Sequence, residues 1–151
     1  MVETARITIR PPRPDDRPEW ERLFRGYVAF YKASLSEEVI EATWQRLLVG
    51  EAGFHLCRLA VDENDRAVGL AHILFHPSTW TKTVYCYLED LFVDPSVRAG
   101  GVGKALIEEM YREADARGAS RTYWVTQEFN YRARGLYDQV ASKAPFVQYR
   151  R

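Results

Sequence analysis

The sequence predicts one α/β domain, residues 1–151, built on a mixed, mostly antiparallel sheet with helices on both of its faces. A length of 151 residues is typical of a single domain. Two apolar β-type runs joined by a short polar connection predict an antiparallel hairpin near the middle of the chain. Strands and helices then alternate toward the C-terminus, which predicts parallel pairing in the same sheet.

The composition is that of a globular protein, and it narrows the classes of function. Hydrophobic residues make up 46% of the chain and charged residues 28%, which is enough for one buried core. Lys plus Arg and Asp plus Glu both number 21, so no excess of positive charge favours nucleic acid or an anionic membrane as partner. The sequence shows neither an export signal nor a run of twenty apolar residues. Cys57 and Cys86 lack metal-site spacing, and we expect buried free thiols in a cytoplasmic protein.

The first half of the chain predicts a strand, two helices and a hairpin. Ala5 to Ile9 alternates apolar and polar residues before a run of prolines, as in a strand followed by a turn. A helix is expected next, because apolar residues recur at steps of three and four at Trp20, Leu23, Phe24, Tyr27, Val28 and Tyr31. Ser36 is the expected N-cap of a second helix, which Gly50 and Gly53 end. The hairpin strands are Phe54–Val61 and Val68–Phe75.

The second half begins with the strongest predicted strand, Tyr85–Val93. A helix is expected over Val102–Ala116. A strand over Thr122–Val125 and a helix over Tyr131–Val140 follow, and Phe146–Tyr149 is expected to form a last strand after a proline.

A glycine-rich turn lies between the strand that ends at Val93 and the helix that begins at Val102. Free backbone amides at a helix start, together with the positive end of the helix dipole, form an anion site suited to a pyrophosphate. A Walker loop is excluded because Ala105 stands where Ser or Thr is needed, and the dinucleotide fingerprint is excluded because Leu106 stands where Gly or Ala is needed. A tight connection without a ligand is the alternative. The residues expected to take part are Arg98, Ala99, Gly100, Gly101, Val102, Gly103 and Lys104.

Two segments carry a resemblance to a known family. Arg98-Ala-Gly-Gly101-Val-Gly103, after Leu91-Phe-Val-Asp-Pro, resembles the acetyl-coenzyme A motif of the GNAT superfamily of N-acetyltransferases. Asn130-Tyr-Arg-Ala133-Arg-Gly-Leu136-Tyr137 is similar to the Asn-x-x-Ala-x-x-Leu-Tyr segment of the same family. The resemblance covers roughly the C-terminal two-thirds of the chain, and it implies a GNAT-like fold with acetyl-CoA as co-substrate. Ala99 departs from the pattern, because many members have Gly there.

The stretch Tyr87-Leu-Glu-Asp-Leu-Phe-Val93 narrows the resemblance to one branch. It is similar to polyamine and thialysine acetyltransferases and to the yeast enzymes that acetylate histones and polyamines. An alkyl ammonium with a pKa of about 10.4 must lose a proton before it attacks a thioester. The resemblance implies Glu89 as that base, with Asp90 as second choice; an acidic residue that caps a network or faces solvent is the alternative for both. Strand alternation is expected to place them on opposite faces, Asp90 with Cys86.

The resemblance also implies roles along the cofactor. Tyr137 stands at the position of the general acid that protonates the departing thiolate, although a plain helix-face aromatic is the alternative. The backbone of Leu91 and Val93, on either side of Phe92, is expected to bind the pantetheine arm where the sheet splays. Asn130 is expected either to bind the same arm or only to cap its helix.

The acceptor is expected to enter over the first two helices. Tyr27 and Tyr31, together with Glu89 and Asp90, are the residues expected to bind it, because aromatic rings attract cationic amines. Trp44 is expected in the core. We expect no metal site, because His72 and His76 lie roughly 13 Å apart along a strand. His55 has no evident partner in the sequence.

The predicted function is acetyl-CoA-dependent N-acetyl transfer to a primary amine of a small molecule, such as a polyamine or an amino acid, by direct attack. A protein-lysine or histone-type acetyltransferase is one alternative, and a non-catalytic CoA-binding sensor is another. The C-terminal run Phe146–Tyr149 resembles a strand that is exchanged between subunits in this branch, which implies a homodimer. A monomer whose edge strand is protected by the terminal arginines is the alternative.

Overall fold

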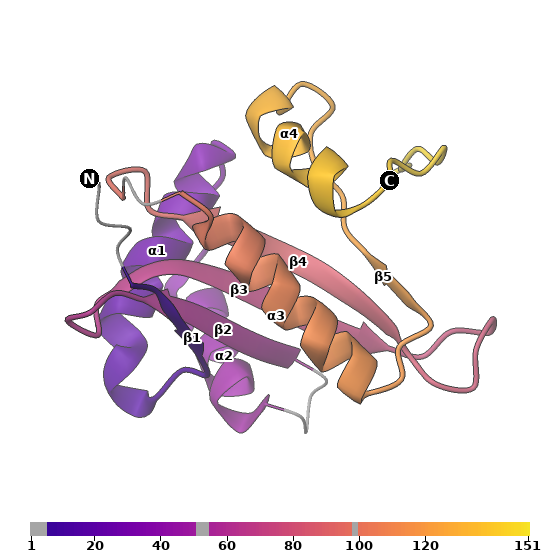
Figure 1. The fold of residues 1–151 in the computed structure, drawn as a ribbon. Helices are drawn as coiled ribbons and strands as arrows, with labels where there is room; N and C mark the ends of the chain where they lie inside the picture. The colour runs from indigo at the N-terminus through magenta and orange to yellow at the C-terminus, as the bar shows by residue number, and fades with distance from the viewer. Residues whose placement is uncertain (1–5, 51–54, 98–99) are drawn as a thin grey trace.

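The computed structural model describes residues 6–50, 55–97 and 100–151. Two N-terminal helices, a five-stranded sheet and a third helix form three layers (Figure 1). In chain order the elements are β1 (Thr8–Arg10), the short 3-10 helix η1 (Pro14–Asp16), α1 (Arg17–Phe30), α2 (Glu37–Val49), β2 (His55–Val61), β3 (Ala67–His76), β4 (Tyr85–Val93), α3 (Val102–Ala116), β5 (Arg121–Tyr123) and α4 (Tyr131–Val140).

The sheet follows the order of the chain, β1-β2-β3-β4-β5. Strands β1 to β4 pair antiparallel and β5 pairs parallel with β4, which confirms the predicted mixed sheet. The predicted hairpin is β2 and β3, joined by residues 62–66. Strand β5 pairs only with Tyr85, Cys86 and Tyr87. Among the described residues, the outer edge of β4 beyond Tyr87 therefore carries no strand.

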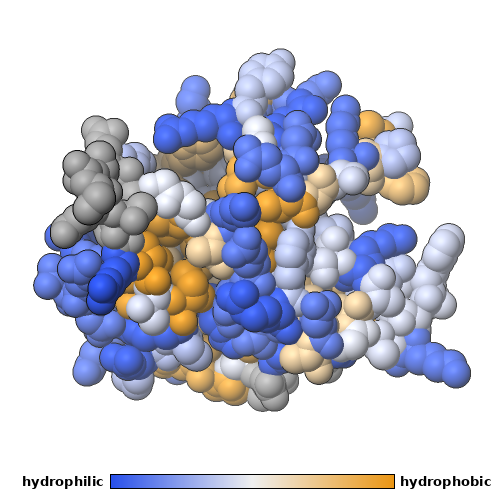
Figure 2. Space-filling view, in the orientation of Figure 1, coloured by the Kyte–Doolittle hydropathy of each residue, from blue (hydrophilic) through white to orange (hydrophobic). Residues whose placement is uncertain are grey.

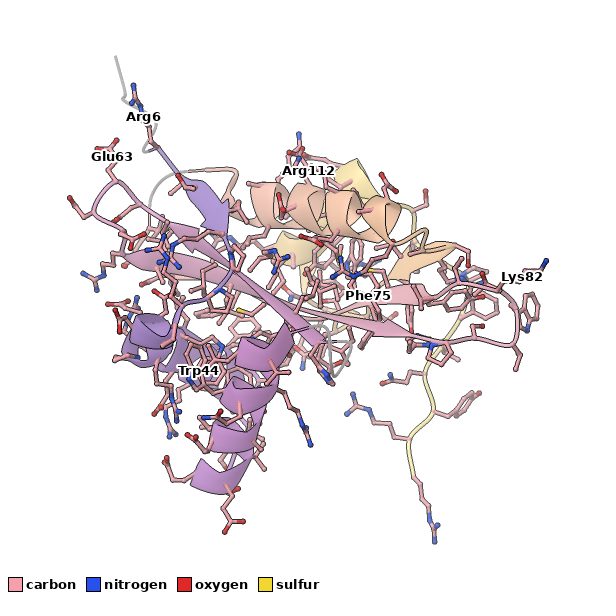
Figure 3. All side chains as sticks on the ribbon, turned by 90° about the horizontal axis from the view of Figure 1, so that it is seen from below. Arg6, Trp44, Glu63, Phe75, Lys82 and Arg112 are labelled. Atoms are coloured by element: carbon pink, nitrogen blue, oxygen red, sulfur yellow. The ribbon has the colours of Figure 1, made fainter. Side chains whose placement is uncertain are left out.

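Each face of the sheet has its own buried cluster, so the prediction of helices on both faces is confirmed. Helices α1 and α2 cover one face with a cluster that includes Trp20, Ile40 and Trp44. Helix α3 covers the other face with Leu106 and its neighbours. Figure 3 shows Trp44 below the sheet and Arg112 of α3 above it. The face that carries α3 is largely hydrophilic outside, with apolar residues gathered in patches on either side of the helix (Figure 2).

Side-chain hydrogen bonds hold the starts of the N-terminal helices. The Ser36 hydroxyl accepts from the Val39 amide at 3.2 Å, so the predicted cap of α2 is confirmed. Gly50 ends the same helix with a φ of 71°, a left-handed value that favours glycine. The Asp16 carboxylate receives the Arg10 guanidinium at 2.7 and 2.9 Å, which ties β1 to the start of α1.

One predicted strand is absent, and another has different bounds from those predicted. The segment Phe146–Tyr149 forms no strand, and Phe146 and Tyr149 are 84% and 91% exposed. An apolar run becomes a strand only where a neighbour supplies hydrogen bonds, and no pairing among the described residues includes this segment. Strand β5 ends at Tyr123 and not at Val125, because Trp124 leaves the sheet and packs on Tyr137 of α4 at 5.3 Å between ring centres.

The first strand begins at Thr8, and the earlier predicted start at Ala5 lies outside the described residues, as does Phe54 at the start of the hairpin. None of the described helices combines the length and apolarity that crossing a bilayer requires.

Candidate active site

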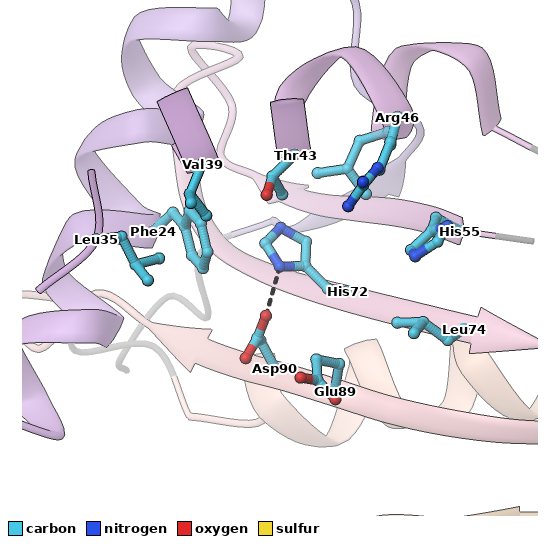
Figure 4. Close-up of a pocket in the computed structure, with 11 residues that line it drawn as sticks. Phe24, Leu35, Val39, Thr43, Arg46, His55, His72, Leu74, Glu89 and Asp90 are labelled. Atoms are coloured by element: carbon cyan, nitrogen blue, oxygen red, sulfur yellow. Dashed lines mark hydrogen bonds and ion pairs between the residues drawn. The ribbon is translucent and has the colours of Figure 1, made fainter. Parts of the chain in front are cut away.

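A pocket of about 190 Å³ opens on the α1–α2 face, between α2 and strands β2, β3 and β4 (Figure 4). Its apolar lining comes from Phe24, Leu35, Val39, Leu47 and Leu74. Its polar lining comes from Thr43, Arg46, His55, His72, Glu89 and Asp90. The pocket is smaller than the roughly 300 to 1,000 Å³ of sites for drug-sized ligands, which suits a small metabolite.

A β-bulge in β4 brings Glu89 and Asp90 to the same pocket. His72 lies opposite Asp90 and Ile73 lies opposite Leu88, so Glu89 is the extra residue. The prediction that Glu89 and Asp90 lie on opposite faces is therefore wrong, because the bulge interrupts the alternation. Beyond it, Leu91 packs in the α3 cluster together with Leu88.

His72 links Asp90 to the core. The Trp20 indole N–H donates to Nε2 of His72 at 2.9 Å, so the other ring nitrogen carries the proton. That Nδ1–H donates to the Asp90 carboxylate at 2.8 Å. His72 is buried, so the chain of three residues fixes both the imidazole and the Asp90 carboxylate. Asp90 is thereby engaged with a core residue, whereas Glu89 stands outside this chain.

The environment of Glu89 makes its carboxylate a stronger base than an ordinary exposed one. Partial burial of its carboxylate and the negative charge of Asp90 raise the pKa of Glu89 above its usual value. The imidazole of His72, a hydrogen bond with Tyr87 and the imidazole of His55 act in the opposite direction without cancelling the rise. A raised carboxylate pKa strengthens the base, provided that it remains ionised at the working pH.

The two tyrosines predicted to bind the acceptor lie beside the pocket and not in its lining. The hydroxyl of Tyr27 is buried near Asp90, and both the burial and that charge raise the pKa of Tyr27. Its ring packs against Tyr31 at 5.0 Å. Trp44 is buried in the core, as predicted. Substrate contact by Tyr27 and Tyr31 stays a prediction.

The outer edge of β4 has the geometry of an extra-strand site. The Asp94 amide donates to the Val68 carbonyl of the neighbouring chain segment at 2.8 Å, so it points toward β3. Backbone groups of alternate residues point to opposite edges of a strand. The backbone groups of Leu91 and Val93 therefore point to the outer edge, where β5 no longer runs. Phe92 points its ring toward α1, with Gly26 close enough that an added Cβ would lie 3.2 Å from it.

The glycine turn leads directly into α3. Gly101 is the N-cap, with a φ of 87° that favours glycine, and a Cβ built on Gly100 or Gly101 meets nothing within 4 Å. A Cβ on Gly103 would lie 3.2 Å from the Leu136 side chain, so this glycine allows α3 and α4 to approach. The side chain of Val102 is buried in the α3 cluster, and cofactor binding by its backbone stays a prediction.

The start of α3 has the geometry of an anion-binding site, because the backbone amides of its first turn are free of intrahelical partners and the positive end of the helix dipole lies there. Lys104 is exposed in the same turn. Arg98 and Ala99, predicted to bind the cofactor, lie outside the described residues.

Tyr137 and Asn130 belong to α4. Burial raises the pKa of Tyr137 to about 12, and the neighbouring Tyr31 adds to the shift, so the phenol keeps its proton at neutral pH. Asn130 caps the helix: its side chain accepts from the Ala133 amide at 3.4 Å and donates to Thr126 at 3.3 Å. The capping role is thus present, and binding of the cofactor arm by Asn130 stays a prediction.

Both cysteines are free and buried, as predicted. Cys86 lies in the cluster under α3, away from the pocket, and burial raises its pKa to about 11. Neither property suits a nucleophile. Within the described ranges, no three side chains of the metal-binding types lie close enough together to hold an ion.

Four polar residues of the pocket were not predicted as part of the site: Thr43, Arg46, His55 and His72. Thr43 and Arg46 belong to α2 and His55 begins β2, so only tertiary packing brings them to β4. The sequence contains little indication that these residues belong to a site. Thr43 and Arg46 fit an ordinary exposed helix surface, and His55 has no evident partner in the sequence.

The chain was compared with known proteins. A model described as the acetyltransferase (GNAT) family matches residues 19–141. The chain belongs to the GNAT family. It is therefore an acyltransferase enzyme, and the resemblance of its two motifs is confirmed.

Relatives of this GNAT enzyme include named N-acetyltransferases. D-amino-acid N-acetyltransferase HPA3 from Saccharomyces cerevisiae is 35% identical over 146 residues, covering 97% of this chain and 91% of the relative. Thialysine N-epsilon-acetyltransferase from Bos taurus is 27% identical over 146 residues, covering 92% and 85%. The solved aminoglycoside N-acetyltransferase AAC(6')-Iy in complex with CoA shares the fold, with a TM-score of 0.83, 19% identity and coverage of 100% and 97%.

Proposed function

We propose that this GNAT enzyme transfers an acetyl group from acetyl-CoA to a primary amine of a small molecule, with Glu89 as base and Tyr137 as acid. One observation carries the proposal: the bulge of β4 presents the Glu89 carboxylate to a pocket at the strand whose outer edge is open. An amine in that pocket and an acyl donor along that edge would both bind at β4, which would bring the two substrates close together.

The residues of the chain fit acetyl-CoA. The outward backbone groups of Leu91 and Val93 would hold the pantetheine arm as a strand is held. The first turn of α3, with open space at Gly100 and Gly101, would receive the pyrophosphate. Bound there, the co-substrate supplies an activated acetyl thioester.

The reaction consists of one substitution with three proton movements: the ammonium loses one proton before attack, the new amide nitrogen loses a second to water, and the departing sulfur gains one. Glu89 takes a proton from the ammonium, directly or through a water, and frees the nitrogen lone pair for attack. The carbon–nitrogen bond forms as the carbon–sulfur bond breaks. Tyr137, which keeps its proton at neutral pH, donates it to the departing sulfur. Buried Cys86 takes no part, so no acetylated enzyme is expected.

Pocket size supports a small acceptor. A volume of about 190 Å³ accommodates a small amine more readily than a folded protein surface. The relatives named for D-amino acids and for thialysine point to the same class of acceptor.

We further propose a homodimer in a reducing, cytoplasmic setting. The exposed apolar side chains of Phe146, Val147 and Tyr149 support the dimer, because an apolar segment that pairs with no described strand is suited to join the sheet of a second copy. The two free thiols support the setting.

Thiol release from acetyl-CoA tests the function. The purified enzyme is offered polyamines, amino acids, amino sugars and a basic peptide, and products are identified by mass. Acetylation of a small amine, with little on the peptide, supports the proposal. Turnover of the peptide alone would make the enzyme a protein acetyltransferase, and CoA binding without acceptor-dependent release would contradict catalysis.

A further inference from the structure

The pocket has walls of opposite charge. Strand β4 contributes the carboxylates of Glu89 and Asp90 to one side, and α2 contributes Arg46 and Thr43 to the other (Figure 4). His55 lies at the same end as Arg46 in this view. A ligand that fills the pocket therefore meets anionic groups at one end and donors at the other.

Arg46 is uncompensated within the described ranges, where no carboxylate lies within ion-pair distance of its guanidinium. The contrast with α1 is clear, because Arg17, Arg22 and Arg25 each pair with two carboxylates. Arg46 lies in the last turn of α2, where the negative end of the helix dipole favours a cation. A lysine would satisfy the dipole equally well, so the dipole does not account for a guanidinium. A planar guanidinium facing a pocket is suited to a carboxylate, which it binds through two parallel hydrogen bonds.

His55 adds an independent observation. Its Nδ1 is buried and has no hydrogen-bond partner among the described residues. A buried polar atom without a partner is costly, and a ligand oxygen would satisfy an N–H at this position. His72 does not compete for that role, because both of its ring nitrogens are already bonded to Trp20 and Asp90.

We propose that Arg46 and His55 form a carboxylate subsite, so that the acceptor is an amino acid whose amine faces Glu89. This inference rests on the proposed transfer of acetyl to a small amine. A polyamine of similar length would place a second ammonium beside the Arg46 guanidinium, and their repulsion disfavours it. The apolar lining, which includes Leu74 and Val39, receives the carbon chain between the two ends.

Matched acceptor pairs test the subsite: lysine against cadaverine, phenylalanine against phenethylamine and alanine against ethylamine, with both enantiomers of each amino acid. Each pair differs by the carboxylate alone. We expect the wild-type kcat/KM to favour the amino acid of at least one pair by about tenfold or more. Arg46→Gln should raise KM for that amino acid about tenfold, with kcat and the decarboxylated partner little changed. Arg46→Lys should restore part of the loss.

Arg112→Gln is the charge-matched control, because it removes one guanidinium from α3 on the other face of the sheet, and it should change neither member of a pair. Calorimetric titration of the same acceptors, with CoA present, gives a second readout that needs no turnover. Equal affinity or turnover within every pair, or no effect of Arg46→Gln, would overturn the subsite while leaving the proposed function intact. Absence of turnover with every amine would contradict the proposed function, and the titration would still decide the subsite.

Discussion

Adjacent carboxylates in one pocket have different partners and therefore different chemistry. The Asp90 carboxylate accepts a hydrogen bond from Nδ1–H of His72, and Nε2 of His72 accepts one from Trp20. The position of Asp90 therefore depends on the core. Glu89 is the unpaired residue of the bulge, and its pKa is raised by burial and by Asp90. Residue type alone does not separate the two roles. The hydrogen bonds of their neighbours do.

Glu89→Gln should lower kcat about a hundredfold or more at neutral pH, because the amine loses its base. Since only ionised Glu89 accepts a proton and its pKa is raised, wild-type kcat/KM should fall as the pH drops through that raised value. The pH–rate profile measures this limb, which should be missing in the variant. Glu63→Gln, on the exposed loop between β2 and β3, is the control. An unchanged profile in Glu89→Gln would rule Glu89 out as the base.

Tyr137→Phe should lower kcat by about a hundredfold while the KM for acetyl-CoA stays within a few-fold, because the phenol donates to the leaving sulfur and the ring is retained. Tyr131→Phe on the same helix is the matched control, since its side chain is 74% exposed. Steady-state kinetics with saturating acceptor measure both effects. Equal losses in the two variants would assign Tyr137 a packing role only.

Elements of this protein are positioned by contacts that their own sequences do not show. The start of α1 is tied to β1 by the Arg10–Asp16 pair, and α3 and α4 approach each other because Gly103 has no side chain. A Cβ built on Gly103 would also lie 3.8 Å from the Val93 side chain, so this glycine lies between α4 and the end of β4. Changes at such positions should therefore alter stability or cofactor affinity with little direct effect on chemistry.

Gly101→Ala should destabilise the fold by about 1 kcal/mol or more, because Ala is strained at a φ of 87°. It should also raise the KM for acetyl-CoA, since the first-turn amides of α3 shift. Gly135→Ala is the control within α4, where a Cβ meets nothing within 4 Å and the expected change is slightly stabilising. Urea unfolding and steady-state kinetics measure the two effects, and equal stability of both variants would contradict the strain argument.

Asp16→Asn should lower the free energy of unfolding by roughly 1.5 to 3 kcal/mol at pH 7, because it removes charged hydrogen bonds between largely buried groups. Arg10 lowers the pKa of Asp16 in the folded state. The wild-type advantage should therefore be complete above the unfolded pKa, near 3.9, and be lost as the pH falls through the lowered folded value. Denaturant unfolding across pH measures it, with exposed Asp15→Asn as control. A pH-independent difference would contradict the linkage.

At the scale of the whole molecule, two surfaces pair with no strand among the described residues: the outer edge of β4 beyond Tyr87 and the C-terminal segment around Phe146. The outer edge of β4 beyond Tyr87 is the proposed place for acetyl-CoA, and the C-terminal residues around Phe146 are the proposed contact with a second copy. They serve different ligands because one is a backbone edge and the other a set of side chains.

Phe146→Asp should shift the protein toward the monomer, because a charge in a buried contact is costly. Light scattering after size-exclusion chromatography, over a range of concentrations, measures the mass. Val49→Asp is the control for an exposed apolar residue on α2, 64% exposed. A monomeric wild-type protein would contradict the dimer, and a variant that dimerises equally would contradict the contact through Phe146.

Local pattern was sufficient for most elements and for the two motifs. The spacing of apolar residues predicts α1, α2, α3 and α4, and alternation predicts β4 with the bounds that the structure has. These signals are local, because helix periodicity, caps and turn glycines act within a few residues. The same locality explains the failure at Phe146–Tyr149, since a strand depends on a neighbour that the segment does not encode.

The sequence by itself determined the family, the helices, the hairpin and the carboxylate segment of β4, because each depends on residues close together in the chain. Only the tertiary structure decided that a bulge directs both Glu89 and Asp90 to one pocket and that His72 donates a hydrogen bond to Asp90. It also decided that Arg46 and His55 line the same pocket. A bulge is a mismatch between two strands, and a pocket is a meeting of three or more elements. Neither is a property of any one segment, so neither can be read before the chain is folded.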